Sequence, residues 1–70
     1  MNTQFLIYST KKSGGNLPSW HGTEFAKDFK SACDKLAMRN ETFRKHYNAD
    51  TLTYEGYPLY PSYKMATKNM

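Results

Sequence analysis

The segment Thr23–Tyr47, TEFAKDFKSACDKLAMRNETFRKHY, dominates the fold prediction for this 70-residue chain. At about 100° per residue, its apolar side chains fall on one stripe of an α-helix: Phe25, Phe29, Ala32, Cys33, Leu36, Phe43 and Tyr47. Thr23 suits an N-cap, and Glu24 and Asp28 suit the first turns, where the helix dipole favours negative charge. Asn40 interrupts the stripe, but the phase is the same on both sides of it. We therefore predict one helix from Thr23 to Tyr47 with a kink at Asn40; the alternative is a break there, with Asn40 capping a second short helix.

Extended segments flank this predicted helix. Gln4–Thr10 is β-branched and aromatic and predicts a strand with apolar groups on both faces, hence a central or covered one. The pair Gly14-Gly15 suits a hairpin tip or a flexible loop. Pro18, which lacks an amide hydrogen, restricts Leu17–Trp20 to an edge strand or an extended segment. Thr51–Glu55 alternates as a half-buried strand does.

The C-terminal part contains two prolines and predicts little regular structure. Because of Pro58 and Pro61, we expect Tyr57–Tyr63 to be an extended segment and not a central strand. The polar Lys64–Met70 predicts a frayed tail. The predicted fold is thus α+β: residues 1–63 form one small domain, with a single amphipathic helix on a two- or three-stranded sheet and an extended Tyr/Pro-rich segment. A helical connection between the strands favours parallel pairing and a glycine hairpin favours antiparallel or mixed pairing, and the sequence leaves both open.

The composition is poor in aliphatic residues and rich in aromatic ones. Five Leu, one Ile, four Phe and no Val make up a seventh of the chain, below the roughly 20% at which disorder is suspected. Six Tyr, four Phe and one Trp offset this, since each buried aromatic ring removes about 150–250 Å² from water. We therefore expect a folded domain with aromatic packing. Abundant Asn, Lys and Tyr without Val is typical of short genes in AT-rich genomes, among them those of small phage regulators.

Several classes of protein are disfavoured by the same counts. A single cysteine excludes an internal disulfide, and no apolar run has the length of a signal peptide or a membrane span. We therefore expect a cytoplasmic protein that does not enter a membrane. Its net charge of +4 suits an acidic protein partner, a nucleic acid or simple solubility.

Few residues suggest chemistry. Cys33 could pair with His21 or His46, but its place in the apolar stripe predicts a small buried hydrophobic residue. One cysteine and two histidines 25 residues apart do not match the spacing of a metal site. The acidic residues alternate with lysine and arginine, which is typical of a solvated helix face. We predict no catalytic residue, no cofactor and no metal.

Tyrosines near the C-terminus recur every three residues, at Tyr54, Tyr57, Tyr60 and Tyr63. On a polyproline-II-like path with three residues per turn, the last three project from one side. Because tyrosine is enriched in interface hot spots, these four and Trp20 are the predicted contacts with a partner. The leading hypothesis is a small non-catalytic inhibitor or adaptor that docks on a larger host or cellular protein. In the plainer interpretation the rings clamp the C-terminal segment onto the sheet. The helix stripe also suits a homodimer.

A nucleic-acid-binding module with little sequence specificity is the alternative. Its phosphate contacts would come from Lys11, Lys12, Arg39, Arg44, Lys45 and Lys64, with tyrosines stacking on bases. Against a concentrated patch, residues 21–50 hold six basic and five acidic residues.

Overall fold

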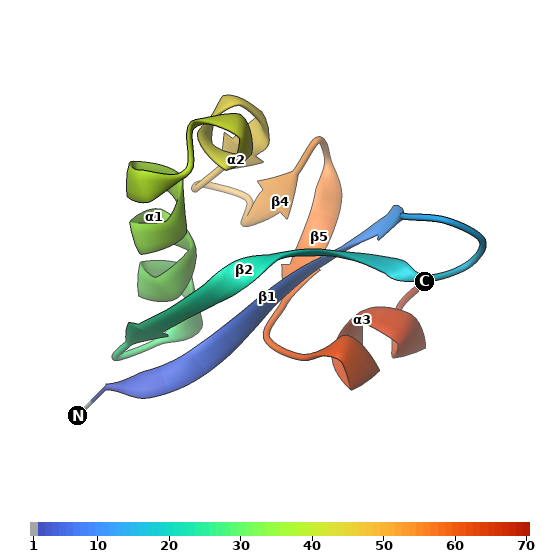
Figure 1. The fold of residues 1–70 in the computed structure, drawn as a ribbon, viewed down its shortest axis with the longest axis horizontal. Coiled ribbons are helices and arrows are strands. Elements are labelled where there is room, and N and C mark those ends of the chain that lie inside the picture. The colour runs from blue at the N-terminus through green and yellow to red at the C-terminus, as the bar shows by residue number, and fades with distance from the viewer. Residues whose placement is uncertain (1) are drawn as a thin grey trace.

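Two long strands form a ribbon on which the other elements are arranged (Figure 1). The computed structural model describes residues 2–70, and these form a five-stranded sheet with three short helices. The elements are β1 Thr3–Lys12, β2 Pro18–Ala26, α1 Phe29–Arg39, α2 Glu41–His46, β3 Tyr47–Asn48, β4 Thr53–Tyr54, β5 Tyr57–Tyr60 and α3 Tyr63–Lys68. The strand order is β2-β1-β5-β4-β3, and every pairing is antiparallel. The prediction of one helix on a two- or three-stranded sheet is therefore wrong.

The predicted helix is wrong at its N-terminal end, where Thr23–Ala26 belongs to β2. This part pairs with β1, with Leu6 opposite Thr23 and Phe5 opposite Glu24. The helix begins at Phe29 because the Asp28 side chain accepts a hydrogen bond of 2.8 Å from the Ser31 amide. Thr23–Ala26 also fits a strand, and pairing with the ten-residue β1 outweighs its helical phase. Pro18 lies, as predicted, in an edge strand.

Asn40 breaks the helix, so the alternative is correct and the single kinked helix is wrong. Its backbone is extended, its amide donates to the Leu36 carbonyl at 2.9 Å, and its side chain accepts from the Phe43 amide at 3.0 Å. One residue thus ends α1 and caps α2. The break turns Phe43 into the core, where its ring is almost completely buried.

Tyr57–Tyr63, which was expected to be an extended segment and not a central strand, provides β5 in the middle of the strand order. Its first half pairs with β4, and its second half pairs with β1 through Leu59 opposite Ser9 and Tyr60 opposite Tyr8. Pro58 is tolerated because it pairs only with Thr53 of β4 and lies beyond the end of the β1 ladder. Between β4 and β5, Glu55 and Gly56 both have positive φ, as a type I′ hairpin turn requires.

Residues 64–70 were expected to fray, but most of them lie in α3. The Ser62 side chain caps this helix by accepting from the Met65 amide at 3.2 Å, and Ala66 is completely buried. Helix α3 lies on the opposite side of the β1–β2 ribbon from α1 and α2 (Figure 1). No helix in the described part of the chain has the length and hydropathy needed to cross a membrane.

The main core lies between the sheet and helices α1 and α2. Its buried members are Ile7, Ala26, Ala32, Cys33, Leu36, Ala37, Phe43, Tyr54 and Leu59. The Phe43 ring stacks on those of Tyr47 and Tyr54, with centroids 5.1 and 5.5 Å apart. The buried rings of Phe43 and Tyr54 thus occupy positions that a larger domain would fill with aliphatic side chains. Cys33 is buried, as predicted.

Candidate functional site

The β1–β2 ribbon has one face toward the core and one toward α3, which we call the inner and outer faces. On β1, Ile7 and Ser9 are completely buried on the inner face, whereas Leu6 and Tyr8 alternate with them onto the outer face. Helix α3 covers the β5 side of the outer face, where the rings of Tyr63 and Tyr8 meet edge to face at 5.7 Å. Helix α3 also contacts β2, but Trp20 and Phe25 of β2 remain more than half exposed.

Three large apolar side chains are exposed on the outer face of the ribbon. Residues opposite each other in an antiparallel pair share a face, and Trp20 lies opposite Tyr8 while Phe25 lies opposite Gln4. Together with Leu6 they form what we call the outer patch. Their exposed fractions are 40% for Leu6, 60% for Trp20 and 57% for Phe25.

The tyrosines predicted to share one side are divided between the two faces. Tyr54 is buried in the core, and Tyr57 is its cross-strand partner on the same face. Tyr60 lies opposite Tyr8 on the outer face, and Tyr63 packs on Tyr8 from α3. The three-residue repeat fails because Tyr57–Tyr60 is a strand, in which side chains alternate with period two.

Trp20 is therefore the predicted contact that lies in the outer patch, with Tyr60 and Tyr63 on the same face. Leu6 and Phe25 were missed as surface residues. Leu6 was assigned to a strand covered on both faces, and Phe25 to the helix stripe. The signal for Phe25 was the strand-like alternation of Thr23–Ala26.

The six basic residues predicted to contact nucleic acid do not form one patch. Lys11 is ion-paired with Glu55, and Arg39 with Glu24. The remaining four are dispersed: Arg44 and Lys45 on α2, Lys12 at the end of β1 and Lys64 on α3. Helices α2 and α3 lie on opposite sides of the ribbon (Figure 1), so one straight backbone cannot contact all of them.

The net charge nevertheless has a clear location. Residues 24–55 hold six basic and six acidic residues, which balance. Residues 2–23 and 56–70, which form β1, most of β2, β5 and α3, hold four lysines and no acid. Because Lys11 is paired with Glu55, the lysines of these elements without an ion-pair partner among residues 2–70 are Lys12, Lys64 and Lys68.

Ser9 and His21 form the pair that most resembles a nucleophile and its base. The Ser9 hydroxyl and His21 Nε2 lie 2.8 Å apart. However, Ser9 is completely buried, and the His21 ring packs on Tyr54 with a centroid distance of 4.2 Å. Burial, with a smaller contribution from Lys11, lowers the pKa of His21 to about 4. A substrate cannot reach Ser9 in this arrangement, so the pair serves to tie β2 to β1.

The other reactive side chains are also part of the fold's own contacts. Burial raises the pKa of the Cys33 thiol to about 12, so it is not a thiolate at neutral pH. Among residues 2–70, no three His, Cys, Asp or Glu side chains come close enough to hold a metal ion.

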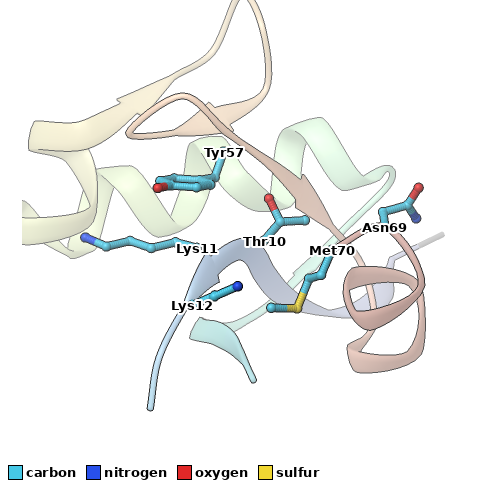
Figure 2. Close-up of a pocket in the computed structure, with 6 residues that line it drawn as sticks. All are labelled: Thr10, Lys11, Lys12, Tyr57, Asn69 and Met70. Atoms are coloured by element: carbon cyan, nitrogen blue, oxygen red, sulfur yellow. The ribbon is translucent and has the colours of Figure 1, made fainter. Parts of the chain in front are cut away.

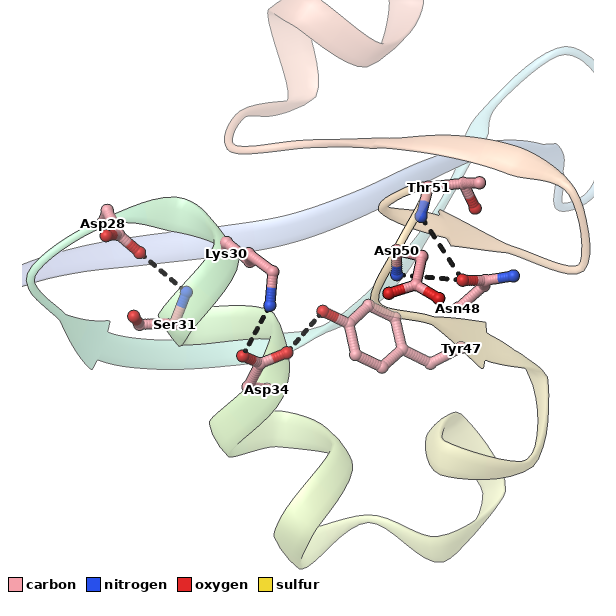
Figure 3. Close-up of polar contacts among 8 residues, drawn as sticks. All are labelled: Asp28, Lys30, Ser31, Asp34, Tyr47, Asn48, Asp50 and Thr51. Carbon is pink, nitrogen blue, oxygen red and sulfur yellow. Dashed lines mark hydrogen bonds and ion pairs between the residues drawn. The ribbon is translucent and has the colours of Figure 1, made fainter.

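Acidic side chains near α1 are engaged in local hydrogen bonds (Figure 3). Asp34 accepts from the Tyr47 hydroxyl at 2.7 Å and is ion-paired with Lys30. Burial, and then this bond to Asp34, raise the pKa of Tyr47. Farther along, Asn48 accepts from the Asp50 amide at 2.9 Å and closes the turn after β3. These contacts fasten α1 to β3, order the turn and engage the carboxylates of Asp28 and Asp34.

Comparison with known proteins gives no relative for this chain. No family model, no curated protein and no solved structure matches it. What the chain does must therefore follow from its own surface and charge.

Proposed function

We propose that this chain is a small non-catalytic binding protein that docks on an acidic surface of a larger protein through the outer patch. The observation that carries the proposal is the exposure of Leu6, Trp20 and Phe25 in a row on a two-stranded ribbon. Large apolar side chains gathered on one exposed face are typical of interaction sites, and tryptophan is among the residues enriched in hot spots. The ribbon holds these side chains in place before binding, which lowers the entropy lost on docking.

The charge distribution supports an acidic partner over a second copy of the chain. Three lysines have no ion-pair partner among residues 2–70, namely Lys12 on β1 and Lys64 and Lys68 on α3, and these elements also form the outer face, so two such faces would repel each other. An acidic rim on a partner would instead attract them. The part of the helix stripe that lies in α1 and α2 packs into the core, and Phe25 is its one member in the outer patch.

Binding to single-stranded nucleic acid is the second candidate. It is favoured by the exposed rings of Trp20 and Tyr63 on the outer face, where α3 also carries Lys64 and Lys68. Leu6 favours a protein, because leucine offers no stacking surface to a base.

An inhibitor or an adaptor fits this proposal better than a catalyst, because the surface offers contact area and no reactive group. A cytoplasmic site of action is part of the same proposal. The single cysteine is buried and kept as a thiol, which suits a reducing compartment.

The proposal is tested by capturing partners from host lysate on the immobilised chain, with and without nuclease. Trp20→Ala combined with Phe25→Ala should abolish capture, because it removes both aromatic rings of the outer patch. The fold should survive, because both rings are more than half exposed and add little to its stability. Met38→Ala is the matched control, since Met38 is 80% exposed on α1, away from the patch. Capture that disappears with nuclease supports the second candidate, and capture unchanged by the double variant overturns the proposed surface.

A further inference from the structure

Pro58 opens a gap between β1 and β5. The ladder between them ends at Ser9 and Leu59, while β1 continues to Lys12. The Leu59 amide donates to the Leu52 carbonyl at 3.1 Å, on the β4 side. Because successive residues of a strand direct their backbone groups to opposite sides, the Pro58 nitrogen faces β1 and has no hydrogen to donate. The ladder therefore ends at Ser9, and the next residue of β1, Thr10, has no partner in β5.

A hollow of about 530 Å³ lies where this ladder has ended. It is lined by Thr10, Lys11, Lys12, Tyr57, Asn69 and Met70 (Figure 2). Its volume lies within the range of about 300–1,000 Å³ that is usual for small-molecule sites. The Tyr57 ring lies on one side, and Lys12 and Met70 lie across from it.

The hollow is cationic. Lys11 lines it with its stem, while its ammonium group is bound to Glu55. The side chain of Lys12 makes no ion pair with any residue in the described range 2–70. The lining residues Asn69 and Met70 follow α3, and neither α3 nor β1 contains an acidic residue. The hydrogen bond from Lys11 lowers the pKa of Glu55, so the Glu55 carboxylate stays ionised and paired with Lys11.

We propose that the hollow binds a planar aromatic ring that carries a phosphate or carboxylate group. The ring would lie against Tyr57, which is 44% exposed, since aromatic rings gain from stacked or tilted contact. The anion would bind the Lys12 ammonium group and the Thr10 hydroxyl, because hydrogen bonds to charged groups are the stronger kind. This site lies at the end of the ribbon and does not depend on the outer patch or on a protein partner.

The proposal is tested by titrating the isotopically labelled chain with small probes and following its amide NMR signals. Adenosine monophosphate and phenyl phosphate are the two ring-bearing probes, and adenosine and inorganic phosphate are the controls that each carry half of the chemistry. At least one ring-bearing probe should shift the signals of Thr10, Lys12 and Tyr57 saturably. Each control should bind about tenfold more weakly or worse, because one charged hydrogen bond or one stacked ring is lost. A response to adenosine monophosphate alone identifies a nucleotide site, and a response to phenyl phosphate alone identifies a site for aryl phosphates.

Variants locate the site. Lys12→Glu and Tyr57→Ala should each weaken binding about tenfold or more, whereas Lys27→Glu, which makes the same charge change at an exposed site between β2 and α1, should not. Signals of the core must stay in place in all three variants. The proposal is overturned if no probe gives saturable shifts, if inorganic phosphate binds as well as the ring-bearing probes, or if Lys12→Glu binds as the unaltered chain does.

Discussion

Replacing Phe43 with alanine is expected to remove a large part of the free energy of unfolding. This ring is almost completely buried, and it lies within 5.5 Å, centroid to centroid, of the rings of His21, Tyr47 and Tyr54. Truncation of a buried phenylalanine to alanine costs about 3–5 kcal/mol, since it removes apolar contact and leaves a cavity. At about 0.05–0.15 kcal/mol per residue, a chain of this length is stable by roughly 3.5–10 kcal/mol. The variant should therefore lose about 30% or more of its free energy of unfolding and unfold at a markedly lower urea concentration.

Phe25→Ala is the matched control for this variant. Both residues belonged to the predicted helix stripe, but Phe25 is 57% exposed on β2. Its truncation should cost about 1 kcal/mol or less, which is the range for an exposed strand position. Urea unfolding followed by far-UV circular dichroism measures both free energies on the same scale. Equal losses for the two variants would refute the assignment of Phe43 to the core and of Phe25 to the surface.

Three further predictions concern the ribbon and its contacts. The free energy of unfolding should fall by about 1–2 kcal/mol between pH 6.5 and pH 4, after allowance for partial exposure of the His21 ring. The reason is that folding lowers the pKa of His21 to about 4, so the unfolded chain binds the proton first as the pH falls. Urea midpoints across this pH range check the prediction, and a flat profile contradicts it. Gly22→Ala should cost about 1–3 kcal/mol, since the added Cβ would lie 2.9 Å from Leu36 Cδ1, and an unchanged thermal midpoint would refute this close approach. Lys35 and Arg39 donate to the Phe25 and Thr23 carbonyls on the edge of β2, at 2.7 and 3.1 Å, and so protect this edge from pairing with another chain. The double variant Lys35→Ala with Arg39→Ala should therefore self-associate in light scattering. A double variant that stays monomeric at every concentration refutes the protective role.

The strand β1 and the glycine turn after it could be predicted because their signals are local. Gln4–Thr10 is β-branched and aromatic, and Gly14 and Gly15 both adopt the positive φ that suits glycine. The start of the helix could not be placed, because the four residues Thr23–Ala26 fit both the helical period of about 3.6 residues and the strand period of two. Its state is decided by the backbone partners that β1 offers, and these are distant in sequence.

The remaining errors concern very short elements. Strand β3 has two residues, too few to show any alternation, and β4 contains only Thr53–Tyr54 of the predicted strand Thr51–Glu55. Helix α3 has six residues and would be unstable alone, so it depends on the burial of Ala66 against the sheet. For the site, Trp20 was foreseen from its type, while Leu6 and Phe25 required knowledge of which face α3 leaves open.

The central claim, that the outer patch docks on a protein, is tested most directly by photo-crosslinking. A benzophenone amino acid is placed at Phe25 in one variant and at Met38, on α1, in another. After irradiation in host lysate, the Phe25 variant should give a discrete adduct that resists nuclease, is digested by protease and weakens at about 0.5 M salt as the lysines are screened. The Met38 variant should give none. Equal adducts from both positions, or an adduct that nuclease removes, would contradict the claim.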